Sequence, residues 1–424
     1  MAERRNYIIG SGVEGSSGAI TVQNGSGRKA RKEAKKAKKI REPKLRLIDG
    51  SMDPVFFVLV VVMLVYGLIM VFSASYIEGL TYYNDGYKYV RTQGMAAIIG
   101  VIAMLFISFF DYHILYNSNV IILGYTAMLG LLTYTSFFGT ESASARRWIE
   151  IGSFSFQPSE AMKPVLVIFT SFLAIKLLEN PKRDNMPFLR RYLPLLGSLA
   201  LVCLNMVLQR HISGLLIMGA LWFCVVFLSG IPYKDIFKMF MIIAVGGVAV
   251  LLLYSTMREG GLSYISDRLT SMSTIDDGVI TDDNWQTMQS LIAIGSGGWF
   301  GLGFGESRQK YLWLPEAQND FIIAVIVEEL GYVGGIAVVI LFALLIYRGF
   351  RIAKKAPDKF GMLITSGITF QIGLQAILNI GVACNAFPNT GVSLPFFSSG
   401  GSALMIQLVE MGVILGVSRQ CENI

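Results

Sequence analysis

The residues with the clearest chemical potential are cations set at the edges of long apolar segments. Arg147 and Lys163 flank a stretch in which Pro158 followed by Ser159 is typical of a helix start. Lys163 would then lie one turn into an apolar helix, where a cation is costly in lipid and is expected to face a polar cavity. No acidic partner is obvious nearby in the sequence, so we expect Arg147 and Lys163 to form an anion site. The alternative is a lysine that only reaches out to the membrane interface.

Carboxylates follow in a long polar segment. Asp276 and Asp277 come after Arg268, and Asp282 and Asp283 stand a few residues further on. A carboxylate that is ionised and close to a hydroxyl can act as a general base, and two adjacent acids can raise the pKa of one of them. The alternative is that all four acids form a solvated loop face.

A glycine-rich loop continues this segment. Its glycines at 295, 297, 298, 301, 303 and 305 allow close approach of the backbone, for example to a phosphate. Arg308 and Lys310 add cations, and residues 289–294 before the loop have the pattern of an amphipathic helix lying on a membrane. Glycine-rich loops are common, so the loop alone is weak evidence for an anion site.

Two adjacent carboxylates, Glu328 and Glu329, lie inside the next apolar run. At least one should face a water-filled cavity, pair with a cation or be protonated. A structural hydrogen-bonding role is the alternative for Glu329. Residues 385–402 contain two prolines and three glycines, which predicts a fixed, non-helical entry to the last apolar run.

The composition indicates which kind of element positions these groups. The chain has 424 residues, of which 53% are hydrophobic and only 15% charged. Soluble domains carry about 25% charged residues, so the deficit indicates lipid as the solvent. The four cysteines show no C-x-x-C spacing and there are two histidines, which predicts neither a disulfide framework nor a metal site. The net charge of +7 is concentrated in the N-terminal tail and short loops, and we expect no nucleic-acid partner.

Ten apolar runs are long enough to cross about 30 Å of hydrocarbon. They lie at 54–74, 92–110, 119–137, 162–178, 193–209, 212–230, 236–255, 320–347, 361–384 and 401–418. We therefore expect an all-α integral membrane protein of the plasma membrane with about ten transmembrane helices.

Basic loops predict the orientation of these helices. Loops 179–192 and 348–360 are rich in lysine and arginine, which is typical of cytoplasmic loops. Both termini should then be cytoplasmic, with a large outer loop, 256–319, between spans 7 and 8. Residues 1–50 are expected to be a disordered basic tail, and residues 51–424 the membrane domain. We expect the basic tail to keep the N-terminal end of the first helix in the cytoplasm, to contact anionic lipid heads, or to do both.

These segments, in this order, resemble the SEDS family of shape, elongation, division and sporulation proteins (FtsW, RodA and SpoVE). The pieces are S-A-S at 73–75, R-W-I…Q-P-S-E…K at 147–163, G-L-G-F-G-E-S-R-Q-K at 301–310, L-P-E-A-Q-N-D-F at 314–321, E-E-L-G at 328–331 and P-N-T-G-V-S-L-P-F-F-S-S-G-G-S at 388–402. The forms at 301–310 and 314–321 look more like the FtsW and SpoVE branch than RodA.

The resemblance implies a peptidoglycan glycosyltransferase that polymerises lipid II at the outer membrane face, in cell division or in sporulation. It implies lipid II, membrane lipids and a class B penicillin-binding protein as partners. Two other functions stay open: a flippase that moves lipid II across the membrane, and a catalytically silent scaffold that activates the penicillin-binding protein. The large outer loop favours catalysis, since a flippase needs no base there.

The resemblance also implies site residues. The family places its catalytic aspartate between Arg268 and Gln286, in a proline-containing pattern that this chain lacks, and the aligned position falls on Gly278 or Val279. Asp277 is the nearest carboxylate, followed by Asp276 and then Asp282, and these are the candidate catalytic residues. The candidate substrate-binding residues are Arg147, Lys163, Arg268, Gln289, Ser290, Arg308, Lys310, Asp320, Glu329, Thr390, Ser398 and Ser402. No cofactor is fixed by these residues, and a requirement for a divalent cation, Mg²⁺ or Mn²⁺, stays open.

Overall fold

The computed structural model describes residues 50–142, 145–151, 154–181, 185–257 and 284–421. The predicted basic tail, residues 1–50, lies almost entirely outside the described residues. Arg268 and the acids Asp276, Asp277, Asp282 and Asp283 also lie outside them.

Ten long helices form the described bundle, and each coincides with one predicted span. They are α2 (Pro54–Tyr83), α3 (Lys88–Ser108), α4 (Ser118–Phe138), α5 (Pro158–Glu179), α6 (Phe188–Leu208), α7 (Ile212–Leu228), α8 (Tyr233–Met257), α11 (Ile322–Lys355), α12 (Lys359–Ala383) and α13 (Gly401–Ser418). Eight of them are long and apolar enough to cross a membrane by length and composition, and α7 is a shorter apolar helix. With α8, which has 25 residues, the count agrees with the ten spans expected.

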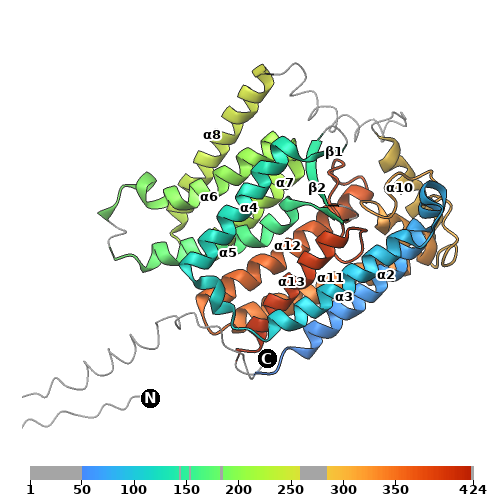
Figure 1. Cartoon of the computed structure of the whole chain (residues 1–424), viewed down its shortest axis with the longest axis horizontal. Coiled ribbons are helices and arrows are strands. Elements are labelled where there is room, and N and C mark those ends of the chain that lie inside the picture. The colour runs from blue at the N-terminus through green and yellow to red at the C-terminus, as the bar shows by residue number, and fades with distance from the viewer. Residues whose placement is uncertain (1–49, 143–144, 152–153, 182–184, 258–283, 422–424) are drawn as a thin grey trace, which may run out of the picture. The chain divides into compact units, whose positions relative to one another are not determined.

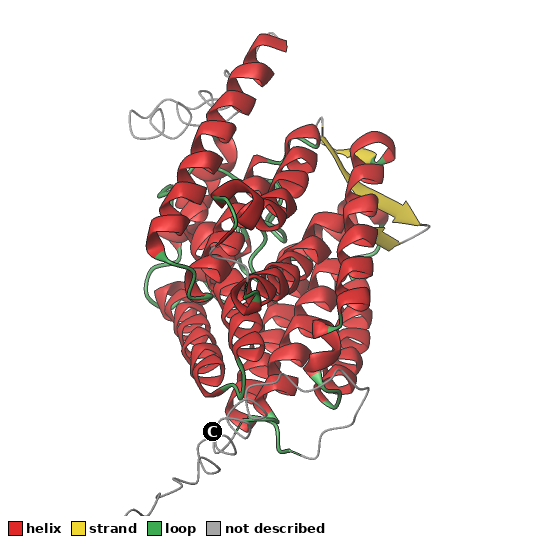
Figure 2. Cartoon of the chain, turned by 90° about the vertical axis from the view of Figure 1, so that its left-hand side faces the viewer, coloured by secondary structure: helices red, strands yellow, loops and turns green. Residues whose placement is uncertain are grey.

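Short elements fill the connections. A 3₁₀ helix, η1 (Tyr112–Tyr116), joins α3 to α4, and α10 (Trp285–Ser296) precedes α11 where an amphipathic helix was predicted. The strands β1 (Thr140–Ser142), β2 (Ala145–Ile151) and β3 (Phe154–Phe156) form an antiparallel sheet in that order. The expectation of an all-α chain missed this small sheet. Figure 2 shows it at the end of the bundle opposite the C-terminus, and we call these the sheet end and the terminal end.

The start of the first helix shows how local chemistry fixes an element of this bundle. Asp53 caps α2 by accepting a hydrogen bond from the Phe56 backbone N–H at 2.9 Å, and Pro54 occupies the first turn. The same buried carboxylate accepts a charge-assisted hydrogen bond from Arg348 Nε, near the end of α11, at 2.8 Å. Asp53 therefore fastens α2 to α11 at the terminal end.

The helices at the centre of the bundle are α5, α12 and α13. Figure 1 shows α5 beside α12, and α13 beside α3. A Cβ atom added at Gly412 of α13 would lie 2.7 Å from the Met104 carbonyl oxygen of α3, and one at Gly100 would lie 2.5 Å from the Leu408 side chain. Small residues of this kind let membrane helices approach closely, and here they set the contact between α3 and α13.

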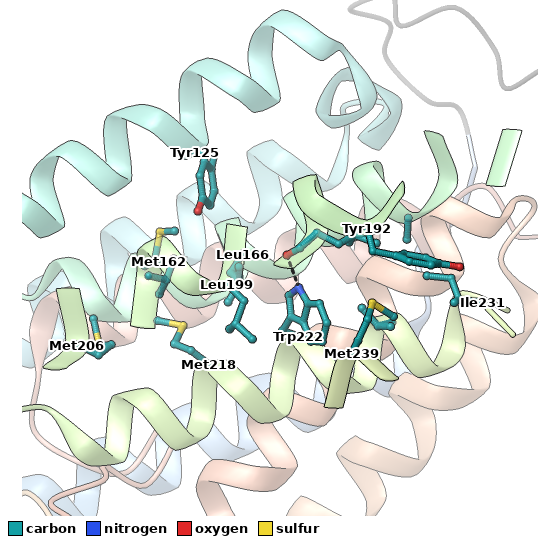
Figure 3. Packing of buried hydrophobic residues seen from close by; sticks show 14 of the residues in the cluster. Tyr125, Met162, Leu166, Tyr192, Leu199, Met206, Met218, Trp222, Ile231 and Met239 are labelled. Atoms are coloured by element: carbon teal, nitrogen blue, oxygen red, sulfur yellow. Dashed lines mark hydrogen bonds between the residues drawn. The ribbon is translucent and has the colours of Figure 1, made fainter. Parts of the chain in front are cut away.

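A large hydrophobic cluster packs α4 to α8 together (Figure 3). It includes Tyr125, Met162, Tyr192 and Trp222, and the Trp222 indole N–H donates a hydrogen bond to the Leu195 carbonyl at 3.1 Å. The indole polar group is thus satisfied inside the apolar core. This half of the bundle supports α5, the helix that carries Lys163.

A buried histidine joins three segments at the terminal end. His113 Nδ1 lies 2.5 Å from Asp111 Oδ1, and His113 Nε2 lies 2.9 Å from Asp358 Oδ2, at the start of α12. Gln420, after α13, donates a hydrogen bond to the same Asp111 at 2.9 Å. Burial lowers the pKa of His113, but its hydrogen bonds to the two aspartates outweigh burial and raise the pKa to about 9.

We expect this cluster to make folding stability depend on pH. A histidine whose folded pKa is raised adds stability that is fully present below its unfolded pKa of about 6.5 and is lost as pH rises through about 9. The unfolding temperature of the detergent-purified protein should therefore fall between pH 6.5 and 9.5. His113→Gln should be less stable at pH 6.5 and should lose little further stability up to pH 9.5. If the unfolding temperature of the variant depends on pH as strongly as that of the wild type, His113 does not cause this dependence.

Candidate functional site

A break in α11 shapes the site at the sheet end. Gly331 has φ 71° and ψ −174°, a left-handed backbone that favours glycine and interrupts the helix. The loop after α10 uses the backbone groups that the break frees. Leu302 N–H donates to the Glu328 carbonyl at 2.9 Å, and Tyr332 N–H donates to the Gly298 carbonyl at 2.9 Å. The freed polar groups are therefore satisfied by protein, as they must be at membrane depth.

The glycines of this loop are required by the closeness of the two backbones. A Cβ atom at Gly301 would lie 2.1 Å from the Glu329 carbonyl oxygen, and one at Gly331 would lie 2.3 Å from the Trp299 carbonyl oxygen. The prediction that the glycines permit close approach is confirmed. In the structure, however, they approach the backbone of α11.

The first of the paired carboxylates holds the segment after the glycine loop. Ser307 Oγ donates a hydrogen bond to Glu328 Oε2 at 2.5 Å, and the Arg308 backbone N–H donates to Glu328 Oε1 at 3.0 Å. The Arg308 side chain itself is exposed. The backbone of Arg308 is thus held by Glu328, while the residue is exposed at the surface of the bundle.

The second carboxylate, Glu329, forms a buried ion pair with Lys310. Lys310 Nζ lies 2.8 Å from Glu329 Oε1, and the two side chains are 4% and 0% exposed. Ser73 Oγ of α2 donates to the same carboxylate at 2.7 Å, while Lys310 Nζ also donates to the Gly305 carbonyl at 2.6 Å. Two residues predicted to bind substrate therefore bind each other, and they join α2, α11 and the glycine loop.

The buried lysine of α5 is also paired. Lys163 is 2% exposed, and its Nζ lies 2.6 Å from Glu160 Oε1, one turn earlier in α5. The expectation that Lys163 has no acidic partner nearby is wrong. In a helix the side chains at i and i+3 share one face, so the partner was present in the sequence.

Arg147 reaches the same region from β2. Its guanidinium donates a hydrogen bond to the Arg210 carbonyl at 2.8 Å, between α6 and α7. The charges of Arg147 and Lys163 both act on His211, which stands at the N-terminal end of α7. Burial and, to a smaller extent, the charges of Arg147 and Lys163 lower the pKa of His211 to about 3, so this histidine is neutral at pH 7.

Asp320 completes the charged cluster from the segment before α11. Burial, together with the charges of Glu316 and Glu160, raises the pKa of Asp320 to about 7 against the opposing charge of Arg147. Arg147 and Glu160, the partner of Lys163, are therefore within electrostatic reach of Asp320. We call Arg147, Lys163 and Asp320, with Glu160 and His211, the charged cluster. It offers two cations and an acid that titrates near neutral pH.

The segment before α13 is fixed beside this cluster. Ser398 Oγ donates to the Asn319 carbonyl at 2.7 Å, and Ser213 Oγ at the start of α7 donates to the Thr390 carbonyl. Asn379 of α12 donates to the carbonyls of Asp320 and Val392, at 2.7 and 2.8 Å. The predicted non-helical entry to the last span is confirmed. Ser402 is buried in the first turn of α13.

The two candidate residues of α10 are buried as well. Ser290 Oγ donates a hydrogen bond to the Ala383 carbonyl at the end of α12, at 2.9 Å, and Gln289 is 6% exposed. Gln286 accepts a hydrogen bond from Asn389 at 2.9 Å. The helix α10 is thus packed on the end of α12 and on the segment before α13.

Roles for Ser73, Glu160 and His211 were not predicted from the sequence. Ser73 belongs to the S-A-S segment that carried the resemblance, and Glu160 stands at helical spacing from Lys163. Within the described ranges, no group of three or more histidine, cysteine or acidic side chains is arranged to hold a metal ion. The candidate base and the acids around it belong to residues 258–283, which are not described.

Comparison with known proteins gives matches that cover most of the chain. A family model for cell cycle proteins of the FtsW, RodA and SpoVE type matches residues 54–423. Stage V sporulation protein E of Bacillus subtilis (strain 168) is 35% identical over 370 residues, which cover 87% of this chain and 97% of that protein. The probable peptidoglycan glycosyltransferase FtsW of Geobacter sp. (strain M18) is 32% identical over 374 residues, which cover 88% and 98%.

Solved structures with the same fold also match. The crystal structure of the rod shape determining protein RodA of Thermus thermophilus superposes with a TM-score of 0.61 at 26% identity, covering 88% of this chain and 98% of that one. A chain of a peptidoglycan synthase complex, solved to explain the coordination of polymerization and crosslinking, gives a TM-score of 0.65 at 24% identity. It covers 88% of this chain and 99% of its own, and it supports the fold.

Proposed function

The chain belongs to the FtsW, RodA and SpoVE family of cell cycle proteins, and on this premise we propose that it is a peptidoglycan glycosyltransferase that polymerises lipid II into glycan strands. It is a multi-pass membrane protein. The observation that carries the proposal is the charged cluster beside the fixed segment before α13, at the sheet end of a bundle that matches the family along its whole length.

The reaction needs two kinds of group. The 4-hydroxyl of one sugar attacks the anomeric carbon of another and loses its proton to a base, while the bond from that carbon to the lipid pyrophosphate breaks. The pyrophosphate leaves with the bonding electron pair and needs cations or N–H donors. Arg147 and Lys163 are the cations proposed for this role. Asp277 is proposed as the base, on the strength of its place in the sequence alone.

The position of the base can be tested by neutralising single acids. Asp277→Asn should abolish polymerisation of lipid II, because the amide cannot take the proton, while membrane levels of the protein stay normal. Asp282→Asn is the matched control and should keep most of the activity. Normal polymerisation by Asp277→Asn together with an inactive Asp282→Asn would place the base further along the chain.

The two other functions give different results in the same preparation. A flippase would move lipid II between the leaflets of sealed vesicles without lengthening it. The two intramembrane charges that could line such a path are already compensated by protein, since Lys163 pairs with Glu160 and Glu329 pairs with Lys310. A scaffold would leave lipid II unchanged and would act only by raising crosslinking by its partner. The departure of residues 268–286 from the family pattern is the observation that favours this reading.

The proposed partners are lipid II and a class B penicillin-binding protein, which crosslinks the strands. This pairing rests on membership of the family, whose model matches residues 54–423. A divalent cation, Mg²⁺ or Mn²⁺, is proposed as an aid to the leaving pyrophosphate. If polymerisation continues at full rate in excess EDTA, the reaction requires no divalent cation.

We propose that both termini are cytoplasmic and that the sheet end faces outward, because the basic loops lie at the terminal end. Two native cysteines test this arrangement. Cys384 is exposed after α12 at the sheet end, and Cys421 follows α13 at the terminal end. A membrane-impermeant thiol reagent should label intact cells at Cys384, and Cys384→Ser should abolish this labelling. Labelling of Cys421 before permeabilisation would reverse the topology.

A further inference from the structure

The glycine loop carries large apolar side chains that the bundle leaves uncovered. Trp299 is 69% exposed, Phe300 84% and Phe304 50%. They lie within residues 299–304, which we call the aromatic loop. In water, such a cluster would be costly, so another apolar phase is expected to cover it.

The aromatic loop lies directly against the outer surface of α11. Val333 N–H donates a hydrogen bond to the Trp299 carbonyl at 3.2 Å, and the Trp299 ring meets the Tyr332 ring edge-on at 5.9 Å. From Val333 onward, α11 presents exposed apolar side chains at helical spacing, such as Ile336 and Ile340. The loop is therefore continuous with the face of α11 that contacts lipid.

The length of α11 places the loop at a definite depth. Arg348 marks the terminal end of the span, where it pairs with Asp53. About 20 residues of helix cross the hydrocarbon core, and counting back from Arg348 reaches Glu328. The backbone of the loop bonds to Glu328, Glu329 and the residues around Gly331. The loop thus lies at the boundary between hydrocarbon and headgroups, where tryptophan is enriched.

We propose that the aromatic loop inserts into this boundary of the bilayer and that phospholipid acyl chains cover Trp299 and Phe300. Beyond the loop, Glu306 and Arg308 are exposed charges that face the headgroups and water. Glu328 and Glu329 hold both the inserted loop and Lys310, so the insertion fixes the depth of the Glu329–Lys310 pair in the membrane. This inference does not depend on the enzymatic activity proposed above.

Spin-label accessibility tests the insertion in liposomes. The full chain, with Cys203, Cys224, Cys384 and Cys421 replaced by alanine, receives one label at a time through Phe300→Cys, Glu306→Cys or Val339→Cys. Val339 is 48% exposed in the middle of α11 and serves as the lipid-facing reference. Oxygen collects in hydrocarbon, whereas a charged or polar nickel chelate stays in water. The label at position 300 should therefore prefer oxygen several-fold more than the label at position 306, and should resemble the label at 339.

Two results would overturn the proposal. If the label at position 300 is as accessible to the nickel chelate as the label at position 306, the loop lies in water. A label at 300 that neither reagent reaches, while the label at 339 is accessible to oxygen, would mean that protein covers the loop. Gel filtration of each labelled variant, at the elution volume of the unlabelled chain, establishes that the bundle is intact.

Discussion

Glu329→Ala is expected to give one of the largest losses of stability of any single substitution in the described chain. It would leave the Lys310 ammonium buried without its carboxylate and would remove the acceptor of the Ser73 hydroxyl. Removing one partner of a buried ion pair typically costs about 3–5 kcal/mol, because the remaining charge is uncompensated. The variant should unfold at a clearly lower temperature in detergent and should accumulate less in the membrane.

A double-mutant cycle separates the pair from the rest of the loop. Lys310→Met with Glu329→Gln removes both charges and leaves an amide for Ser73, so the double variant should be more stable than Lys310→Met or Glu329→Gln alone. Glu306→Ala, in the same loop but exposed, is the matched control and should unfold like the wild type. Additive losses in the double variant would mean that Lys310 and Glu329 do not stabilise each other.

Lys163→Met is expected to give one of the largest losses of activity among the described residues in a protein that still folds. If Lys163 stabilises the leaving pyrophosphate, its removal should slow polymerisation by at least about 100-fold, as removal of a preorganised charge-stabilising donor does in other enzymes. The measurement is the initial rate of glycan formation from lipid II at equal amounts of membrane protein. Arg147→Ala should reduce the rate in the same direction.

The ion pair with Glu160 supplies the control for this substitution. If Lys163 served only to neutralise Glu160, then Glu160→Gln combined with Lys163→Met should restore polymerisation, because no unpaired charge remains. If Lys163 binds the pyrophosphate, the double variant should stay inactive while its thermal stability recovers. Recovery of activity in the double variant would mean that Lys163 has only a structural role, the neutralisation of Glu160.

The helices could be predicted closely because a span is a property of local composition. The apolar run at 212–230 became α7 at Ile212–Leu228, and the run at 401–418 became α13 with the same bounds. The sheet at 140–156 was missed because its strands are short and are stabilised by pairing with one another. Pairing of that kind depends on turn geometry, which hydropathy does not report.

The sequence indicated candidate residues for the site, but it did not indicate which side chains those residues contact in the structure. Lys163 and Glu160 stand three residues apart on a helix, so their pairing was within reach of the sequence. The pairing of Lys310 with Glu329 depends on the break at Gly331, and the contact with Ser73 joins residues 256 positions apart. Such contacts depend on the packing of α2 against α11, which cannot be predicted from the residues of either helix alone.

The measurement that tests the central claim most directly is the separation by gel of glycan products made from labelled lipid II by the purified wild-type protein. The reaction is run alone and with its cognate class B penicillin-binding protein, whose crosslinking is blocked by a β-lactam. A ladder of glycan strands that appears in the presence of this protein and disappears in Lys163→Met is the predicted result. Unchanged lipid II in every wild-type reaction, from protein that elutes as a folded species, would contradict the assignment as a glycosyltransferase and leave the scaffold function in its place.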